Sequence, residues 1–376
     1  MTKESTPLSD DRKMDNLTEE QQKVLHSMRV SRMILPITIG LCVVAYMLYR
    51  QYDPAAFQKI HWSGRTFLWI GISFTLLMLR HLAFATRMYI LSHGHFSFKK
   101  CIELIFIFEF SLCVTPTTLG GSAVSLFVMT QERLSAARTT TIVLYKIVLD
   151  SFFFISTLPL LFWACGAKMI RPDMIDVFDI DWRARIFYGS YMGMAIYGSF
   201  FFYGLFINPM LMRRFLSWMT TFPILKRFHE KAVHLGDNLL LAADEMRNIG
   251  WRRHLAAFLA TWAAWACKFL LISALIVGIH NPPIDFQHGL LLYARLQAMF
   301  IIMAFSPSPG GAGFAEFVFG DFLSDFVNVP SVALIIALIW RVMSYYLYLA
   351  AGAIIVPNWI RKVFLARPKD LDSNPH

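Results

Sequence analysis

Two apolar regions of the sequence are broken near their middles: residues 101–130 by Pro116-Thr-Thr-Leu-Gly-Gly-Ser122, and residues 288–327 by Pro309-Gly-Gly-Ala-Gly-Phe-Ala315. Proline removes a backbone hydrogen-bond donor and glycine favours tight turns, so we expect a helix to end at each break. Most of the remaining halves are too short to cross a bilayer, which takes about 20 apolar residues. Each region is therefore predicted to form a re-entrant helical hairpin, which enters the membrane and turns back. A broken span is the alternative.

The composition indicates a membrane protein. Hydrophobic residues make up 56% of the chain and charged residues 16%, which leaves too little polar surface for a soluble protein of this length. Apolar stretches long enough to cross a bilayer occupy residues 33–49, 66–91, 139–164, 186–207, 254–279 and 331–356. The predicted fold is therefore all-α and polytopic, with six full spans plus two Pro/Gly-broken re-entrant hairpins.

Basic residues gather on one side of this arrangement. If both hairpins return to their own side, one face receives the two termini and the segments 92–102, 131–138 and 208–253, which hold most of the lysines and arginines. The opposite face is richer in aspartate. The positive-inside rule then places both termini in the cytoplasm, and we expect the inner membrane of a bacterial cell. A net charge of +10 therefore indicates contact with anionic lipid rather than nucleic acid.

The same topology divides the chain into two halves of opposite orientation. Each half consists of two spans, a hairpin and a span, so an inverted repeat is predicted. The expected divisions are a cytoplasmic polar tail at 1–32 without a cleavable signal, repeat 1 at 33–164, an external loop at 165–185, repeat 2 at 186–357 and a cytoplasmic tail at 358–376. Within repeat 2, residues 208–253 are expected to form an amphipathic cytoplasmic segment.

The breaks are predicted to form a binding site for an anionic group. Irregular backbone at membrane depth must be covered by protein or line a wet cavity. Helices that begin at a break would point unpaired N–H groups and positive dipole ends into such a cavity, where a phosphate could bind. The residues assigned to this role are Pro116, Gly120, Gly121, Pro309, Gly310, Gly311 and Gly313. The alternative is that the glycines only allow close helix packing.

Ionisable residues at membrane depth add to this site. Charge in lipid is costly, so such residues usually face a cavity or a partner. The residues assigned to substrate binding are Arg80, Lys146, Asp150, Glu316 and Arg341. Lys146 and Asp150 lie about one helical turn apart and could pair with each other. Arg87 is expected to extend to the cytoplasmic head groups, whereas Lys268 and Arg295 could either do the same or hold helices together.

Motifs of catalysis are missing from the sequence. It contains no HExxH pair, no GxSxG elbow, no P-loop and no CxxC, and its cysteines lack the spacing of metal ligands. We therefore expect no cofactor, no metal and no covalent chemistry.

The run Ser306-Pro-Ser-Pro-Gly-Gly-Ala-Gly-Phe-Ala-Glu316, together with the earlier Pro116–Gly121 break and the spans that follow, resembles the lysylphosphatidylglycerol synthase transmembrane family, the flippase-like domain. The resemblance covers about residues 33–357. In multiple peptide resistance factors this domain moves aminoacylated phosphatidylglycerol between leaflets, and a soluble C-terminal domain synthesises that lipid. The resemblance therefore implies lipid translocation by this chain without aminoacyl transfer, with a separate lipid-modifying enzyme as a possible partner.

Two departures from the family pattern leave the cargo open. The acidic residue and arginine that often follow the first break are replaced here by Ser122-Ala-Val-Ser125, and a glutamate–arginine pair of the next span corresponds to Tyr145-Lys146. A flippase-like transporter of an anionic phospholipid or a lipid-linked head group is the leading hypothesis. An ion-coupled transporter of small solutes, and a membrane-embedded lipid-modifying enzyme or assembly partner, are the alternatives.

Overall fold

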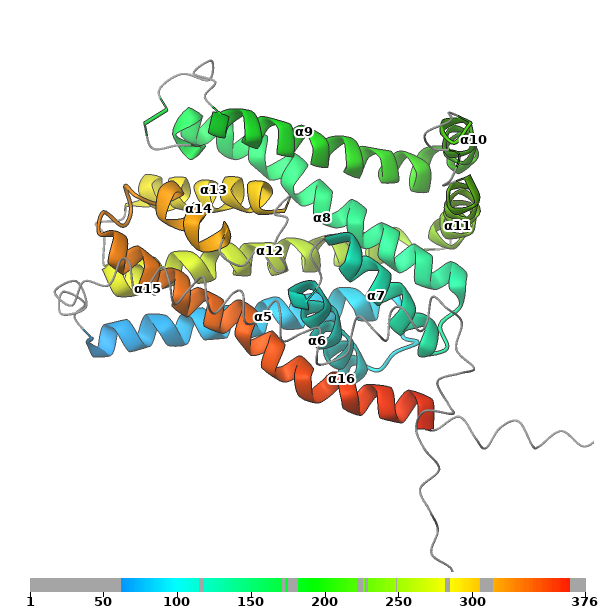
Figure 1. Ribbon diagram of the computed structural model, residues 1–376, viewed down its shortest axis with the longest axis horizontal. Coiled ribbons are helices and arrows are strands. Elements are labelled where there is room, and N and C mark those ends of the chain that lie inside the picture. The colour runs from blue at the N-terminus through cyan, green and yellow to red at the C-terminus, as the bar shows by residue number, and fades with distance from the viewer. Residues whose placement is uncertain are drawn as a thin grey trace, which may run out of the picture.

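The structure is a computed structural model that describes residues 62–114, 118–170, 173–174, 182–221, 226, 229–247, 249–280, 285–304 and 314–365. Every regular element in these residues is a helix (Figure 1). The helices begin and end as follows: α5 Gly64–Leu91, α6 Phe98–Val114, α7 Thr118–Gln131, α8 Ala136–Cys165, α9 Trp182–Phe202, α10 Pro209–Met219, α11 His229–Arg247, α12 Trp251–His280, α13 Phe286–Met303, α14 Phe314–Phe322, α15 Pro330–Arg341 and α16 Leu347–Leu365. The all-α prediction is confirmed for these residues.

Five of the helical stretches are long and apolar enough to cross a membrane: Gly64–Leu91, Arg138–Met169, Ala184–Ile207, Trp251–His280 and Pro330–Val363. They match five of the six predicted spans and identify a polytopic membrane protein. The remaining predicted span, at residues 33–49, lies outside the described residues. The total of six spans therefore stays a prediction.

Two of these stretches contain a π-helical turn. Residues Tyr203–Ile207 end the stretch that begins with α9, and residues Val342–Tyr346 join α15 to α16. The wider turn at Val342–Tyr346 directly follows Arg341 and so changes the direction in which later side chains point. Single π turns within α-helices occur frequently at functional sites.

The first broken region folds as a helical hairpin made of α6 and α7. The Lys100 ammonium at the start of α6 pairs with Glu132, the residue after α7, at 2.6 Å. The indole N–H of Trp359 on α16 also donates to Glu132. The two outer ends of the hairpin are therefore side by side, and its closed end contains residues 115–117, which lie outside the described part of the chain.

The second broken region forms a corresponding hairpin from α13 and α14. Arg295, near the middle of α13, donates to the Phe322 carbonyl at the end of α14 at 3.3 Å and also pairs with Asp325. Helix α14 therefore runs back alongside α13. Asp285 caps α13 by accepting the backbone N–H of His288 at 2.8 Å and a bond from its imidazole at 2.7 Å. These bonds hold the pKa of Asp285 below its usual value.

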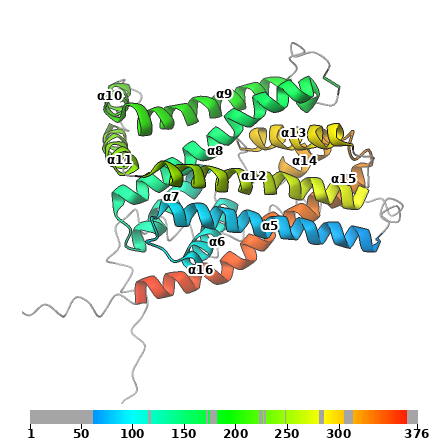
Figure 2. The ribbon, with the colours of Figure 1, turned by 180° about the vertical axis from the view of Figure 1, so that it is seen from behind.

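The two hairpins lie at opposite ends of the helix bundle (Figures 1 and 2). The α6–α7 hairpin is at the end that also carries α10 and α11, and the α13–α14 hairpin is at the other end. This is the arrangement expected if one hairpin enters the membrane from each face. The entry itself, and hence the word re-entrant, stays a prediction.

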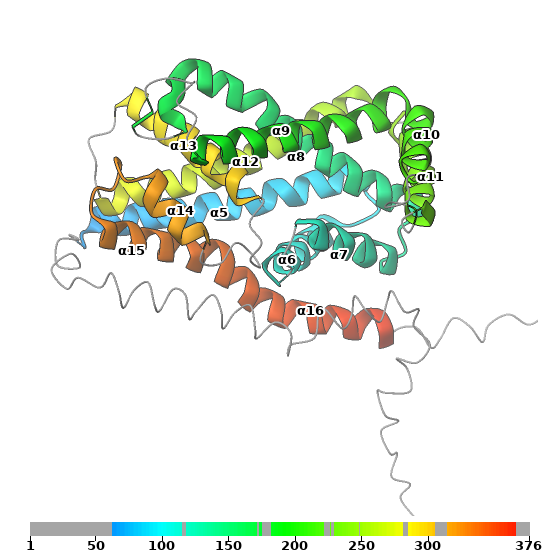
Figure 3. The same ribbon diagram turned by 45° about the horizontal axis from the view of Figure 1, so that its top comes forward.

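Helices α5 and α12 pack along each other through the middle of the bundle. Ser73 donates to the Leu271 carbonyl at 3.2 Å, and Gly278 lets Trp69 approach so closely that a Cβ there would be 2.4 Å from the Trp69 Cβ. Two further contacts flank this pair: α6 of the first half lies against α16 of the second, and α13 of the second half lies against α8 of the first (Figure 3). Under the predicted inverted repeat these two contacts are counterparts of each other.

Helices α10 and α11 pack together at one end of the bundle, within the segment 208–253 (Figure 1). Met212 and Leu216 of α10 are buried, whereas Leu211, Phe215 and Trp218 are exposed. Arg213 of α10 pairs with Asp237 of α11 at 2.6 Å. Such an exposed apolar face beside basic residues is typical of a helix that lies on a membrane surface.

The Gly352→Ala substitution tests the contact between α16 and the first hairpin. A Cβ at Gly352 would lie 2.1 Å from the Phe110 ring, so the hairpin would have to shift. Overpacking of this kind costs about 1–3 kcal/mol. We expect a lower melting temperature for the purified protein in detergent. Gly71→Ala in α5 is the matched control, because a Cβ there meets nothing within 4 Å. Equal melting temperatures of the two variants would contradict this packing.

Candidate functional site

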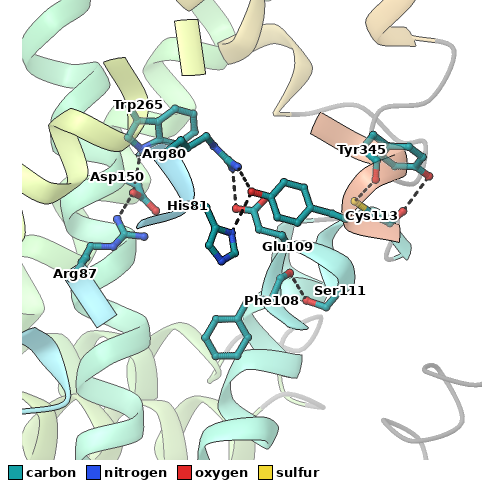
Figure 4. Close-up of polar contacts among 11 residues, drawn as sticks. Arg80, His81, Arg87, Phe108, Glu109, Ser111, Cys113, Asp150, Trp265 and Tyr345 are labelled. Atoms are coloured by element: carbon teal, nitrogen blue, oxygen red, sulfur yellow. Dashed lines mark hydrogen bonds and ion pairs between the residues drawn. The ribbon is translucent and has the colours of Figure 1, made fainter. Parts of the chain in front are cut away.

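A buried polar network joins α5, α6 and α16 in the middle of the bundle (Figure 4). The Arg80 guanidinium pairs with Glu109 at 2.7 Å and donates to the Tyr348 hydroxyl at 3.2 Å. The same hydroxyl lies 3.2 Å from Nδ1 of His81, whose Nε2 lies 3.2 Å from the Ile102 carbonyl oxygen. Arg80 and His81 are both buried. The Glu109 charge is therefore matched by an arginine that is itself held in place.

A second ion pair lies about two turns further along α5. Arg87 pairs with Asp150 of α8 at 2.6 Å and donates to Thr261 of α12 at 3.2 Å. The indole N–H of Trp265 donates to the same Asp150 oxygen at 3.1 Å. Figure 4 shows Arg80 and Arg87 leaving α5 toward these two partners. The Asp150 carboxylate of α8 is therefore bound by side chains from two other helices, α5 and α12.

These contacts correct one sequence-based expectation and decide one pairing that the sequence left open. Arg87 does not extend to the head groups, because its side chain is buried against Asp150. The ion pair of Asp150 with Lys146 that their spacing allowed is not formed, because Asp150 pairs with Arg87. The planar guanidinium also reaches Thr261, so it links α5 to both neighbouring helices, whereas Lys146 would join two positions of one helix.

Two half-buried lysines share this interior. Lys146 lies one turn before Asp150 on α8, and its charge interacts with Asp150, Arg87, Glu109 and Arg80. Lys268 lies on α12, with its ammonium 4.7 Å from the Trp265 ring centre and 4.0 Å from that of Phe300. Its charge interacts with Arg80, Glu109, Asp150 and Arg341. Within the described residues neither lysine forms an ion pair with a carboxylate.

Arg341 adds a further cation from the final span. It is buried at the end of α15, and its guanidinium lies 4.2 Å from the centre of the Tyr345 ring. Tyr345 in turn donates to the Cys113 carbonyl at 3.3 Å, close to the first break. Arg341 thus lies where the π turn meets the tip of the first hairpin.

The charges of the described residues do not balance in this interior. Glu109 and Asp150 are each matched by one arginine, which leaves Lys146 and Lys268 as additional positive charge. Uncompensated charge is costly at membrane depth and marks sites for ions or charged ligands. The arrangement can therefore bind an anionic group between α5, α8 and α12.

The predicted site residues fall into three groups. Arg80, Lys146, Asp150 and Arg341 are brought together in the interior. Gly120, Gly121 and Glu316 lie in the first turns of α7 and α14, so the two glycines begin a helix rather than form a turn, and the Glu316 side chain is not described. Pro116, Pro309, Gly310, Gly311 and Gly313 lie outside the described residues. The binding role of both breaks stays a prediction.

Several residues of this interior were not assigned to the site from the sequence. They are Glu109, Lys268, Arg87, Tyr348 and Trp265. One signal could have found Arg87, because Arg80 and Arg87 are about two helical turns apart and share a face of α5. Arg295, for which two roles were open, holds helices together: its Nε donates to the Lys168 carbonyl at 3.1 Å, away from the centre. No cluster suited to a metal ion occurs among the described residues.

Comparison with known proteins gives a family and one relative. The family model described as the lysylphosphatidylglycerol synthase TM region matches residues 33–352. A UPF0104 membrane protein of Archaeoglobus fulgidus is 22% identical over 314 residues, which cover 80% of this chain and 90% of the relative. No solved structure matches the chain.

The Arg80–Glu109 pair can be tested by a double-mutant cycle. Arg80→Leu leaves the Glu109 carboxylate buried without its partner, which is expected to cost about 3–5 kcal/mol. The double variant Arg80→Leu/Glu109→Leu removes both charges and should recover most of that loss. Unfolding of the detergent-solubilised protein would be followed by circular dichroism. A double variant as unstable as Arg80→Leu alone would argue against the ion pair.

Proposed function

We propose, from the premise that this chain belongs to the lysylphosphatidylglycerol synthase transmembrane family, that it is a flippase-like transporter that moves an anionic membrane lipid between leaflets. The observation that carries the proposal is the surplus of positive charge at the half-buried Lys146 and Lys268, since both described carboxylates beside them are matched by arginines. Cations at this depth attract a negatively charged head group into the protein.

In this proposal only the head group enters the protein. Lys146, Lys268 and Arg341 would attract its phosphate, while the acyl chains remain in the bilayer, where they lose no hydrophobic contact. This division lowers the barrier to flipping, because the costly step in a bare bilayer is carrying a charged group through hydrocarbon. No covalent step is required of the protein.

The helices that begin at the breaks support this role. Helices α7 and α14 each begin directly after a break, and the N–H groups of their first turns are proposed to point toward the interior. The positive ends of their dipoles favour an anion there. The residues of the two breaks are proposed to shape this part of the site: Pro116, Gly120, Gly121, Pro309, Gly310, Gly311 and Gly313. Glu316, which follows the second break, is proposed to take part in substrate binding.

Alternating access would follow from the inverted repeat. With one hairpin at each end of the bundle, a rocking motion of the two halves could open the interior to one leaflet at a time. In the proposed orientation both termini, α10 and α11 are on the cytoplasmic side of the inner membrane. A separate enzyme that makes the lipid is a proposed partner.

Arg341→Ala is expected to slow leaflet exchange. Losing a charged hydrogen-bonding partner costs about 1.5–3 kcal/mol, which corresponds to a rate at least about tenfold lower if it acts in the transition state. Exchange of a fluorescent anionic phospholipid would be measured in proteoliposomes by reduction of the label in the outer leaflet. Lys362→Ala is the control, because Lys362 is an exposed cation in the last turn of α16.

The outcomes separate the alternatives. Exchange that is equally fast with Arg341→Ala and Lys362→Ala would remove Arg341 from the site. Uptake of a soluble substrate without lipid exchange would indicate a small-solute transporter instead. A chemically altered lipid, detected by mass spectrometry, would indicate an enzyme.

A further inference from the structure

Both carboxylates in the described interior are already occupied. Glu109 forms an ion pair with Arg80. Asp150 forms an ion pair with Arg87 and accepts a hydrogen bond from the Trp265 indole N–H. Their cations are satisfied as well, since Arg80 also reaches the Tyr348 hydroxyl and Arg87 reaches Thr261. No carboxylate of the described interior is therefore available to an ammonium group on a cargo lipid. Among the described residues, a lipid whose head group carries an amine would find only like charge here.

The two lysines present a different kind of surface. Each ammonium is a compact charge with three donors and no acceptor, which suits the oxygens of a phosphate. Both side chains are half-buried rather than sealed, so a ligand can reach them. The rings of Trp265 and Phe300 lie against the Lys268 ammonium and keep it in the interior instead of at the membrane surface.

The amount of charge distinguishes the candidate head groups. A phosphodiester such as phosphatidylglycerol carries one negative charge and would leave one lysine uncompensated. A terminal phosphate monoester has a second ionisation near pH 6 and carries close to two negative charges at pH 7. It would match both lysines and offer three acceptor oxygens to their donors.

We propose that the cargo is a lipid ending in a phosphate monoester, bound between Lys146 of α8 and Lys268 of α12. This proposal rests on the proposed function and names its substrate class. Phosphatidic acid and a polyprenyl monophosphate share this head-group chemistry and differ only in the lipid that carries it. The arginine–carboxylate pairs hold the lysine-bearing helices in place and do not contact the phosphate.

The test compares head groups in one assay. Proteoliposomes of phosphatidylcholine would contain traces of labelled phosphatidic acid, phosphatidylglycerol or lysyl-phosphatidylglycerol, and leaflet exchange would be measured for each. We expect phosphatidic acid to exchange about tenfold faster than phosphatidylglycerol, because one additional charged hydrogen bond is worth at least this factor. Replacing phosphatidic acid by a labelled polyprenyl monophosphate then distinguishes the two lipid sources.

Variants link the preference to the lysines. Lys146→Gln and Lys268→Gln should each slow exchange of phosphatidic acid about tenfold and change that of phosphatidylglycerol much less. Lys146→Arg and Lys268→Arg keep the charge and should retain most of the preference. Lowering the pH below about 6 removes the second charge of the monoester, so the preference should shrink there in the wild-type protein.

Each result decides one question. Phosphatidylglycerol or its lysyl ester exchanging as fast as phosphatidic acid would overturn the head-group assignment but leave lipid transport intact. No exchange of any lipid by the folded protein would overturn the proposed function itself. If a glutamine variant fails to fold, native mass spectrometry of the wild-type protein with equal amounts of the lipids replaces it, and binding without preference for phosphatidic acid would overturn the assignment.

Discussion

The fold depends on matching charge inside a largely apolar helix bundle. Helix α5 supplies both arginines that do so, with Arg80 on Glu109 of α6 and Arg87 on Asp150 of α8. In a low-dielectric interior an ion pair must be well oriented and fully hydrogen-bonded to offset its loss of hydration. Tyr348, Trp265 and Thr261 complete that bonding from α16 and α12. One helix thus fixes the relative position of four others, and the first hairpin is held through Glu109.

The second hairpin is held by a similar device at the opposite end. Arg295 is fully buried and gathers three groups, the carbonyls of Phe322 and Lys168 and the carboxylate of Asp325. A guanidinium can do this because its five donors lie in one plane and cannot be deprotonated. Each half of the chain therefore uses arginine to anchor a hairpin. The difference is one of place, since Arg80 lies in the centre whereas Arg295 lies toward the end of the bundle.

The sequence predicted the positions of helices better than the partners of charged side chains. Hydropathy and the Pro/Gly breaks were sufficient to locate five spans and both hairpins, because these signals are local. The partner of Asp150 could not be predicted, because the sequence shows only neighbours on one helix, where Lys146 is the nearby cation. Arg87 is far along the chain, and only the fold, in which α12 packs against both α5 and α8, brings it to Asp150. The π turn at Val342–Tyr346 had no sequence signal that could be read, since its residues suit an ordinary helix equally well.

The same contacts limit how such a protein could move. The interface between α5 and α12 joins the two predicted repeats, and it is held by Ser73 on the Leu271 carbonyl, by the close approach at Gly278 and by Arg87 on Thr261. Sliding at this interface would break a buried charged hydrogen bond and open a tightly packed contact, both of which are costly. If the two halves rock as proposed, the motion has to pivot about the α5–α12 pair. Lys146 and Lys268 lie on α8 and α12, so they stay close to that pivot, where a fixed binding site would need to be.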